Sequence, residues 1–256
     1  MNELSPGLAK GVQSAARRIS LDFSFHRLRS TIWSISIATI ALGVFQQLYD
    51  HWWGGPKIFV FGALLNFDGE KSLPTLWSVL LLIFAAFLIF LNGVAEPRRR
   101  WRSRWSLLFA IFIFLSIDEF ASIHEQLVSV LAPYGFTGFL RYSWVIPYGI
   151  LSLLLGAFYA PFLLALPGRV RWRAILAGGV YIAAALGLET VGGYCATLGD
   201  RTCFRLEVIA EESGEIVGMT LFIMAMSLLL QLRCSSVTLA LQVHSHSGRP
   251  PLPRVQ

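Results

Sequence analysis

The chain has 256 residues, of which 55% are apolar and only 14% are charged, and its mean hydropathy is +0.61. These values exclude an ordinary soluble domain and are typical of a protein that is surrounded by lipid. The net charge of +6 does not indicate nucleic-acid binding, because most basic residues flank hydrophobic segments, where they set membrane orientation.

Six hydrophobic segments are each long enough to cross a bilayer as a helix. They lie near Ser30 to Tyr49, Leu73 to Val94, Trp105 to Val128, Ser143 to Leu166, Trp172 to Tyr194 and Leu206 to Leu232. The sequence therefore predicts an all-α fold, a polytopic membrane bundle with six transmembrane helices. An N-terminal segment (1–29) precedes this domain (30–232), and the tail (233–256) shows no helical period and is predicted to be disordered.

Lysine and arginine are distributed unequally between the two sides of the predicted spans. Sixteen would lie on one side and five on the other. Because positively charged flanks are retained in the cytoplasm, both termini are predicted to be cytoplasmic. On the opposite side, Cys195 and Cys203 fall in the last loop, where an oxidising compartment would permit a disulfide. The sequence leaves open whether this bond forms.

Acidic residues in the third, fifth and sixth spans are the unusual feature of this sequence. A carboxylate in the bilayer costs a few kcal/mol, so it is rare unless it faces a bundle interior or water. Counting about 1.5 Å per residue from the flanking arginines places these acids in one outward layer, with Asp118, Glu189 and Glu215 at the same level. Helical phase predicts that Asp118 and Glu125 share a face. The predicted metal ligands are Asp118, His124, Glu125, Glu189, Glu211, Glu212 and Glu215.

Such crowded carboxylates need protons, cations or metal ions as compensation, and the spans contain no buried Lys or Arg. One histidine with several carboxylates makes a hard, oxygen-rich site, which favours Mg, Mn, Ca or a carboxylate-bridged di-iron pair over zinc. The Glu-x-x-His spacing of di-iron bundles is missing. Glu207 can also be an acid that the helix N-terminus favours, and Glu119 is expected to point away from Asp118.

Four motifs stand out along the chain: Asn66-Phe-Asp-Gly-Glu70 followed by Leu73-Pro-Thr75, Ser116-Ile-Asp-Glu119, His124-Glu125, and Glu211-Glu-Ser-Gly-Glu215. Together they resemble a pattern in a family of uncharacterised multi-pass membrane proteins of bacteria, and the resemblance covers most of the membrane domain. It implies a bacterial inner membrane and a shared acidic site, without an activity. A resemblance to the alkaline ceramidase superfamily is poor, because the further membrane histidines of that zinc site are missing.

Three functions are consistent with these acids. The first is a metal-dependent membrane enzyme that acts on a lipid or lipid-linked substrate, with a spare carboxylate as general acid or base. The second is a cation- or proton-coupled transporter, although an inverted repeat would place the acids of spans three and six in opposite leaflets. The third is an accessory subunit of a membrane complex. The expected partners are the lipid bilayer and a lipid-type substrate, without nucleic acid.

Overall fold

The computed structural model describes residues 18–22, 25–54, 59–69, 71–234 and 238–242. The chain divides into two units, which are described separately. The larger one, Phe25–Ser235, contains the described helices and is called the helical unit below, and the smaller one combines the two ends of the chain.

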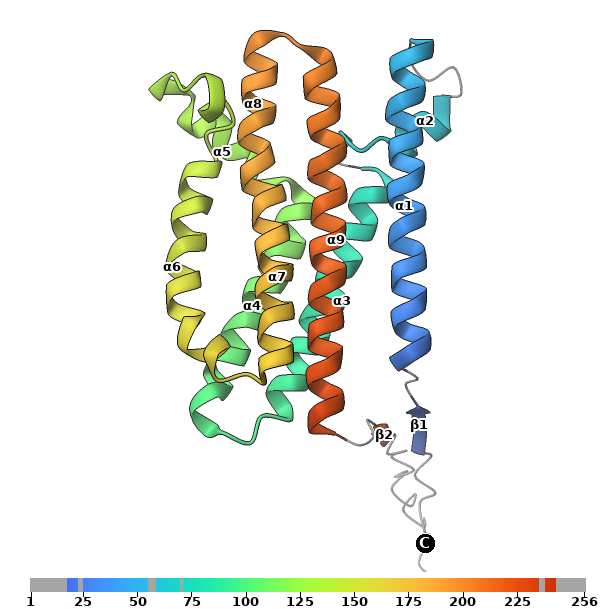
Figure 1. Ribbon diagram of the computed structural model, residues 1–256, viewed down its shortest axis with the longest axis vertical. Coiled ribbons are helices and arrows are strands. Elements are labelled where there is room, and N and C mark those ends of the chain that lie inside the picture. Colours follow the sequence, from blue (N-terminus) through green and yellow to red (C-terminus); the bar gives the residue numbers. More distant parts are fainter. Residues whose placement is uncertain (1–17, 23–24, 55–58, 70, 235–237, 243–256) are drawn as a thin grey trace, which may run out of the picture. The chain divides into compact units, whose positions relative to one another are not determined.

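The helical unit is a bundle of mostly long helices (Figure 1). Two 3₁₀ turns, Ala132–Tyr134 and Gly138–Leu140, precede α6, and a π-helix, η3 (Ala183–Leu188), joins α7 to α8 without a break. The α-helices are α1 (Phe25–Trp53), α2 (Phe59–Leu65), α3 (Leu73–Val94), α4 (Arg99–Ala121), α5 (Ile123–Leu131), α6 (Val145–Leu164), α7 (Gly168–Ile182), α8 (Glu189–Leu198) and α9 (Arg201–Arg233).

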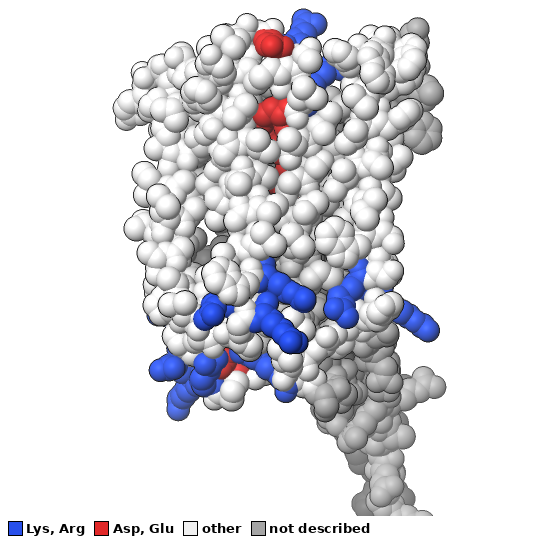
Figure 2. All heavy atoms as spheres, viewed as in Figure 1, with Lys and Arg blue, Asp and Glu red and all other residues white. Residues whose placement is uncertain are grey.

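The long helices lie where the sequence predicts spans. Among the described residues, five helices are long and apolar enough to cross a membrane: α1, α3, α6, the continuous α7–η3–α8 and α9. The bent pair of α4 and α5 makes a sixth if it is counted as one span. Lys and Arg gather near the end of the helical unit where α3 meets α4 (Figure 2), as the charge distribution of the sequence predicts.

The third predicted span is not one straight helix. α4 ends at Ala121, Ser122 adopts the left-handed conformation with φ 48° and ψ 46°, and α5 departs at an angle of 71°. The prediction that Asp118 and Glu125 share one helix face is therefore wrong, because the chain turns between them. Instead, the Asp118 carboxylate accepts the backbone N–H of His124 at 2.9 Å and so caps the first turn of α5.

Two glycines allow α9 to pack closely against the preceding helix. A Cβ added at Gly218 would lie 2.8 Å from the backbone nitrogen of Tyr181, and one added at Gly214 would lie 2.7 Å from Cβ of Ala184. The small-residue pair therefore acts in helix packing, as its spacing indicates. This contact holds α9 against α7 and η3, next to the start of α8 at Glu189.

A buried ionic cluster joins three helices at the arginine-rich end. Glu96, between α3 and α4, is 1% exposed. Its carboxylate accepts hydrogen bonds from Arg98 Nε at 2.9 Å and Trp105 Nε1 at 3.1 Å, and it pairs with Arg233 at the end of α9. Burial raises the pKa of Glu96, but these hydrogen bonds and the charge of Arg233 outweigh it and lower the pKa to about 2.

The smaller unit contains two strands, β1 (Arg18–Asp22) and β2 (Thr238–Gln242), which pair antiparallel with Arg18 opposite Gln242. Polar and apolar residues alternate along β1, the period that suits an extended strand. Strand β2 lies within 233–256, where the sequence predicts no regular structure, and the rest of that tail from residue 243 onward lies outside the described residues.

Candidate metal centre

A cavity of about 1100 Å³ lies inside the helical unit, and its walls come from α4 to α9, from Thr75 of α3 and from the segment 67–69 before α3. Its described lining includes nine carboxylates and one histidine but neither lysine nor arginine. All the predicted ligands line it, together with three further acids: Asp68, Asp118, Glu119, His124, Glu125, Glu189, Glu207, Glu211, Glu212 and Glu215. The prediction that separate spans bring their acids together is therefore confirmed.

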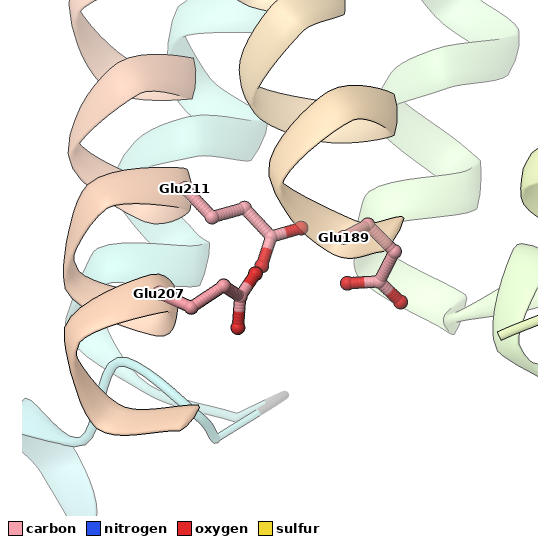
Figure 3. Close-up of side chains that lie close together, drawn as sticks. All are labelled: Glu189, Glu207 and Glu211. Atoms are coloured by element: carbon pink, nitrogen blue, oxygen red, sulfur yellow. The ribbon is translucent and has the colours of Figure 1, made fainter. Parts of the chain in front are cut away.

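Three of these carboxylates lie close enough together to hold one ion. The ligand oxygens of Glu189, Glu207 and Glu211 are all within 4.8 Å of one another. Figure 3 shows that Glu189 extends from α8, whereas Glu207 and Glu211 extend from successive turns of α9. We call these residues the carboxylate trio. A set of three carboxylates suits a hard cation such as Mg²⁺, Mn²⁺ or Ca²⁺.

Glu207 is the most buried member of the trio. Its side chain packs against α8, where a Cβ added at Gly192 would lie 2.5 Å from Glu207 Oε2. The residue is 5% exposed, and Glu207 Oε1 has no hydrogen-bond partner among the described residues. Because a buried carboxylate oxygen without a partner is costly, this position favours a bound cation or proton.

Glu207 is absent from the predicted ligand set, although the sequence carries a signal for it. It precedes Glu211 by four residues, which places both side chains on one face of α9. The alternative explanation, an acid that only the helix N-terminus favours, does not account for its position, because Glu207 points into the cavity and reaches the other two carboxylates.

Glu189 lies further outward than the depth count predicts. That count set Glu189 level with Asp118 and Glu215, whereas its oxygens lie near those of Glu207 and Glu211. The count for Glu189 starts from Arg173, and the count for Glu215 starts from Arg233. Arg173 is the sixth residue of α7 and therefore lies about 8 Å inside the helix end, whereas Arg233 is the last residue of α9.

Asp118 and His124 form a second group in the same cavity. His124 Nδ1 lies 3.2 Å from Asp118 Oδ2, and the Tyr148 hydroxyl donates to Asp118 Oδ1 at 3.1 Å. The first contact spans the bend at Ser122, where α5 turns away from α4 by 71°. When Nδ1 donates to this carboxylate, Nε2 carries the lone pair that a base or metal ligand needs.

Trp144 lies between this pair and the carboxylate trio. Its ring packs against His124 with the ring centroids 4.6 Å apart, and its Nε1 donates to Glu189 Oε1 at 3.0 Å. Neither Trp144 nor Tyr148 is among the residues predicted for the site. Their positions near the start of a span also suit interfacial aromatic residues, so the sequence does not distinguish the two roles.

The remaining predicted ligands line the cavity outside the trio and the Asp118–His124 pair. Glu212 and Glu215 extend from α9, and Glu212 Oε2 is buried without a hydrogen-bond partner among the described residues. Glu125 is exposed on α5. Glu119, which the sequence predicts to point in a different direction from Asp118, also lines the cavity.

A family of protein domains, described as a domain of unknown function (DUF8692), matches residues 32–230. The chain belongs to the DUF8692 family. No curated protein and no solved structure matches the chain. The match agrees with the resemblance to an uncharacterised family, and it includes the trio, the Asp118–His124 pair and their cavity.

The DUF8692 chain contains a disulfide beside the trio. Cys195 of α8 and Cys203 of α9 are bonded, with Cα atoms 5.6 Å apart. The bond closes the short turn between α8 and α9, which carry Glu189 and Glu207. The disulfide that the sequence left open is therefore present, and it restrains the two helices that carry the trio.

Arginine does not neutralise the acids of this DUF8692 cavity. Arg205, one of the two cations closest to them in sequence, donates to the backbone oxygen of Gln47 at 3.1 Å. Among the described residues, none of the following forms a salt bridge with Lys or Arg: Asp118, Glu119, Glu189, Glu207, Glu211, Glu212 and Glu215. The negative charge of these carboxyl groups must therefore be neutralised by protons or by a bound cation.

A cation site at the carboxylate trio predicts that replacing Gly192 by alanine weakens Mn²⁺ binding about tenfold or more, because the new methyl group would displace the Glu207 carboxylate. Titration of the purified protein with Mn²⁺ measures this change. Gly187→Ala is the matched control, since a Cβ there meets nothing within 4 Å. Equal affinities of both variants and the unaltered chain would show that Glu207 takes no part in binding.

Proposed function

We propose that this DUF8692 protein is a membrane enzyme that uses a divalent cation to hydrolyse a lipid or lipid-linked substrate. The observation that carries the proposal is the composition of the cavity. Its acids and His124 lie at one end, and the lining toward the arginine-rich end is apolar, with Leu107 and Ile111 on α4 and Phe222 on α9. Both parts of an amphipathic substrate would find matching surroundings there.

The carboxylate trio would hold the cation. Its three side chains come from two helices that a disulfide joins, and they offer only oxygen ligands. Substrate oxygens and water would complete the coordination, as is usual for Mg²⁺ and Mn²⁺ in hydrolytic sites. When bound, the cation would supply Lewis acidity at the scissile ester or phosphoester bond.

Asp118 and His124 would transfer the proton. His124 Nε2 would take a proton from the water that attacks the ester or phosphoester bond, and it would then deliver this proton to the leaving oxygen. Asp118 would orient the imidazole through Nδ1 and stabilise its charged form. Tyr148 and the His124 backbone hold Asp118 in place for this role.

The proposal places the protein in the bacterial inner membrane with both termini in the cytoplasm. The arginine-rich end of the helical unit would be the cytoplasmic end, by the rule that positive flanks stay inside. The disulfide between Cys195 and Cys203 supports an oxidising compartment at the opposite end. The trio would then face the outer leaflet.

A cation- or proton-coupled transporter is less well supported by the same cavity. Such a protein needs polar or titratable groups along the whole path across the membrane. Among the described lining residues, the carboxylates stop at Asp118 and Glu215, and mainly apolar side chains follow toward Tyr159 and Phe162. This arrangement suits hydrocarbon better than an ion.

Elemental analysis of the purified protein tests the cation. We expect a divalent metal at about one ion per chain and a lower unfolding temperature after chelation, which Mn²⁺ or Mg²⁺ restores, because a ligand that binds only the folded state stabilises it. Glu211→Gln should lose the metal, whereas Glu125→Gln, outside the trio, should keep it. Metal-free protein whose stability chelators do not change would refute the proposal.

A further inference from the structure

The apolar part of the cavity is framed by two hydrogen bonds between α6 and α4. At one end the Tyr148 hydroxyl donates to Asp118, and at the other the Tyr159 hydroxyl donates to the backbone oxygen of Arg104 at 2.9 Å. Tyr159 follows Tyr148 by eleven positions, which corresponds to about 16 Å along α6. The apolar chamber, as we call the part between them, is lined by residues that include Leu107, Ile111, Leu115, Leu151, Leu155 and Met219.

Helix α6 separates this chamber from the surroundings of the bundle. Its buried residues, Val145, Tyr159 and Phe162, lie toward its ends, so its middle is held only loosely against α4 and α7. Leu151 and Leu155 line the chamber from this middle part. The cavity is partly open, and Figure 2 shows a hollow at mid-height on the side where Figure 1 places α6.

Two glycines leave open space in the chamber wall. Gly156 on α6 and Gly178 on α7 both line the cavity, and a Cβ added at either would meet nothing within 4 Å. The chamber therefore has room that the protein's own side chains do not fill. Water is a poor occupant, because an ordered water needs polar partners and most of these walls are apolar.

We propose that the apolar chamber binds one hydrocarbon chain of a membrane lipid, which enters from the bilayer beside α6. The bilayer supplies such chains at the level of α6, and a chain in the chamber would restore the dispersion contacts that an empty space forfeits. The lipid's polar head would then lie at the acidic end, near Asp118 and the trio. That this lipid is the substrate rests on the proposed hydrolysis, whereas binding of its hydrocarbon chain in the apolar chamber does not.

Photolabelling in vesicles tests this inference. The probe is a phosphatidylethanolamine with a diazirine near the end of one acyl chain, and mass spectrometry locates the labelled residues after irradiation. We expect label on inward residues of α4 and α6, such as Ile111 and Leu155. Gly156→Trp should reduce this inward label at least tenfold, because the indole would occupy the chamber. Leu153→Trp, on the same helix but 76% exposed, should leave it unchanged.

Two further variants separate the possible outcomes. Gly178→Phe fills the chamber from α7 and should reduce the inward label in the same way. It provides the test if Gly156→Trp does not fold. Glu211→Gln, which should lack the cation, is expected to retain the inward label, so failure of the proposed hydrolysis would leave this inference standing. Label confined to outward residues such as Leu153, or inward label that the chamber-filling variants do not reduce, would overturn it.

Discussion

Replacing Asp118 by asparagine is expected to lower the rate of the proposed hydrolysis by about 100- to 10,000-fold while the protein stays folded. An asparagine oxygen can still accept the His124 N–H and the Tyr148 hydroxyl. Its amide group, however, would donate toward His124 Nδ1, so Nε2 would carry the hydrogen and could not act as a base. Turnover of the lipid substrate and thermal unfolding measure the two effects separately.

Asp118→Ala provides the comparison, because it removes the cap of α5 as well as the partner of the imidazole. It should therefore lose stability, by about 1 kcal/mol or more, in addition to activity. If Asp118→Asn keeps full activity, then His124 does not act as a base through Nε2. If it instead unfolds as readily as Asp118→Ala, then the carboxylate is chiefly structural.

Replacing Glu96 by glutamine is expected to destabilise the helical unit by about 3 kcal/mol, or roughly 6–12 °C in unfolding temperature. The substitution leaves Arg233 and Arg98 without their buried carboxylate, and the loss of one partner of a buried ion pair is strongly destabilising. Arg99→Gln is the control, since it removes an exposed charge from the same region. Equal unfolding temperatures of the two variants would contradict this role of Glu96.

The Glu96 cluster also predicts a dependence of stability on pH. The pKa of Glu96 is about 2 in the folded protein, compared with 4.5 for the unperturbed group. A lowered pKa means that its contribution, about 3 kcal/mol, is fully present above pH 4.5 and is lost as the pH falls toward 2. Other carboxyl groups titrate in this range, so the difference between the unaltered chain and Glu96→Gln isolates the effect. A difference that does not change between pH 5 and pH 2 would contradict the prediction.

The span pattern is predictable from the sequence because hydropathy and flanking charge act over whole segments. Each predicted span overlaps a described helix or the bent pair of α4 and α5. The bend itself is not predictable, since Ser122 stands between apolar helix residues without a Gly or Pro to mark it. The left-handed turn at Ser122 is accompanied by the Asp118 carboxylate capping the next helix, a contact that only the three-dimensional structure reveals.

The sequence identifies two members of the carboxylate trio but not the third, Glu207, and not the geometry of the trio. Acids in a lipid environment must face the bundle interior, and this requirement alone identifies Glu189 and Glu211. Depth counting assumes that each helix starts at its arginine, and this assumption failed for α7. The burial of Glu207 against Gly192 depends on how α8 and α9 pack. No local pattern encodes that packing.

The most direct test of a metal-dependent lipid hydrolase is turnover of a bacterial lipid extract by the purified protein, followed by mass spectrometry. We predict that one lipid class is consumed and its hydrolysis products appear, that chelation stops the reaction and that Mn²⁺ or Mg²⁺ restores it. Glu207→Gln and His124→Gln should each be inactive. An unchanged lipid extract after incubation with metal-loaded, folded protein would contradict the proposed function.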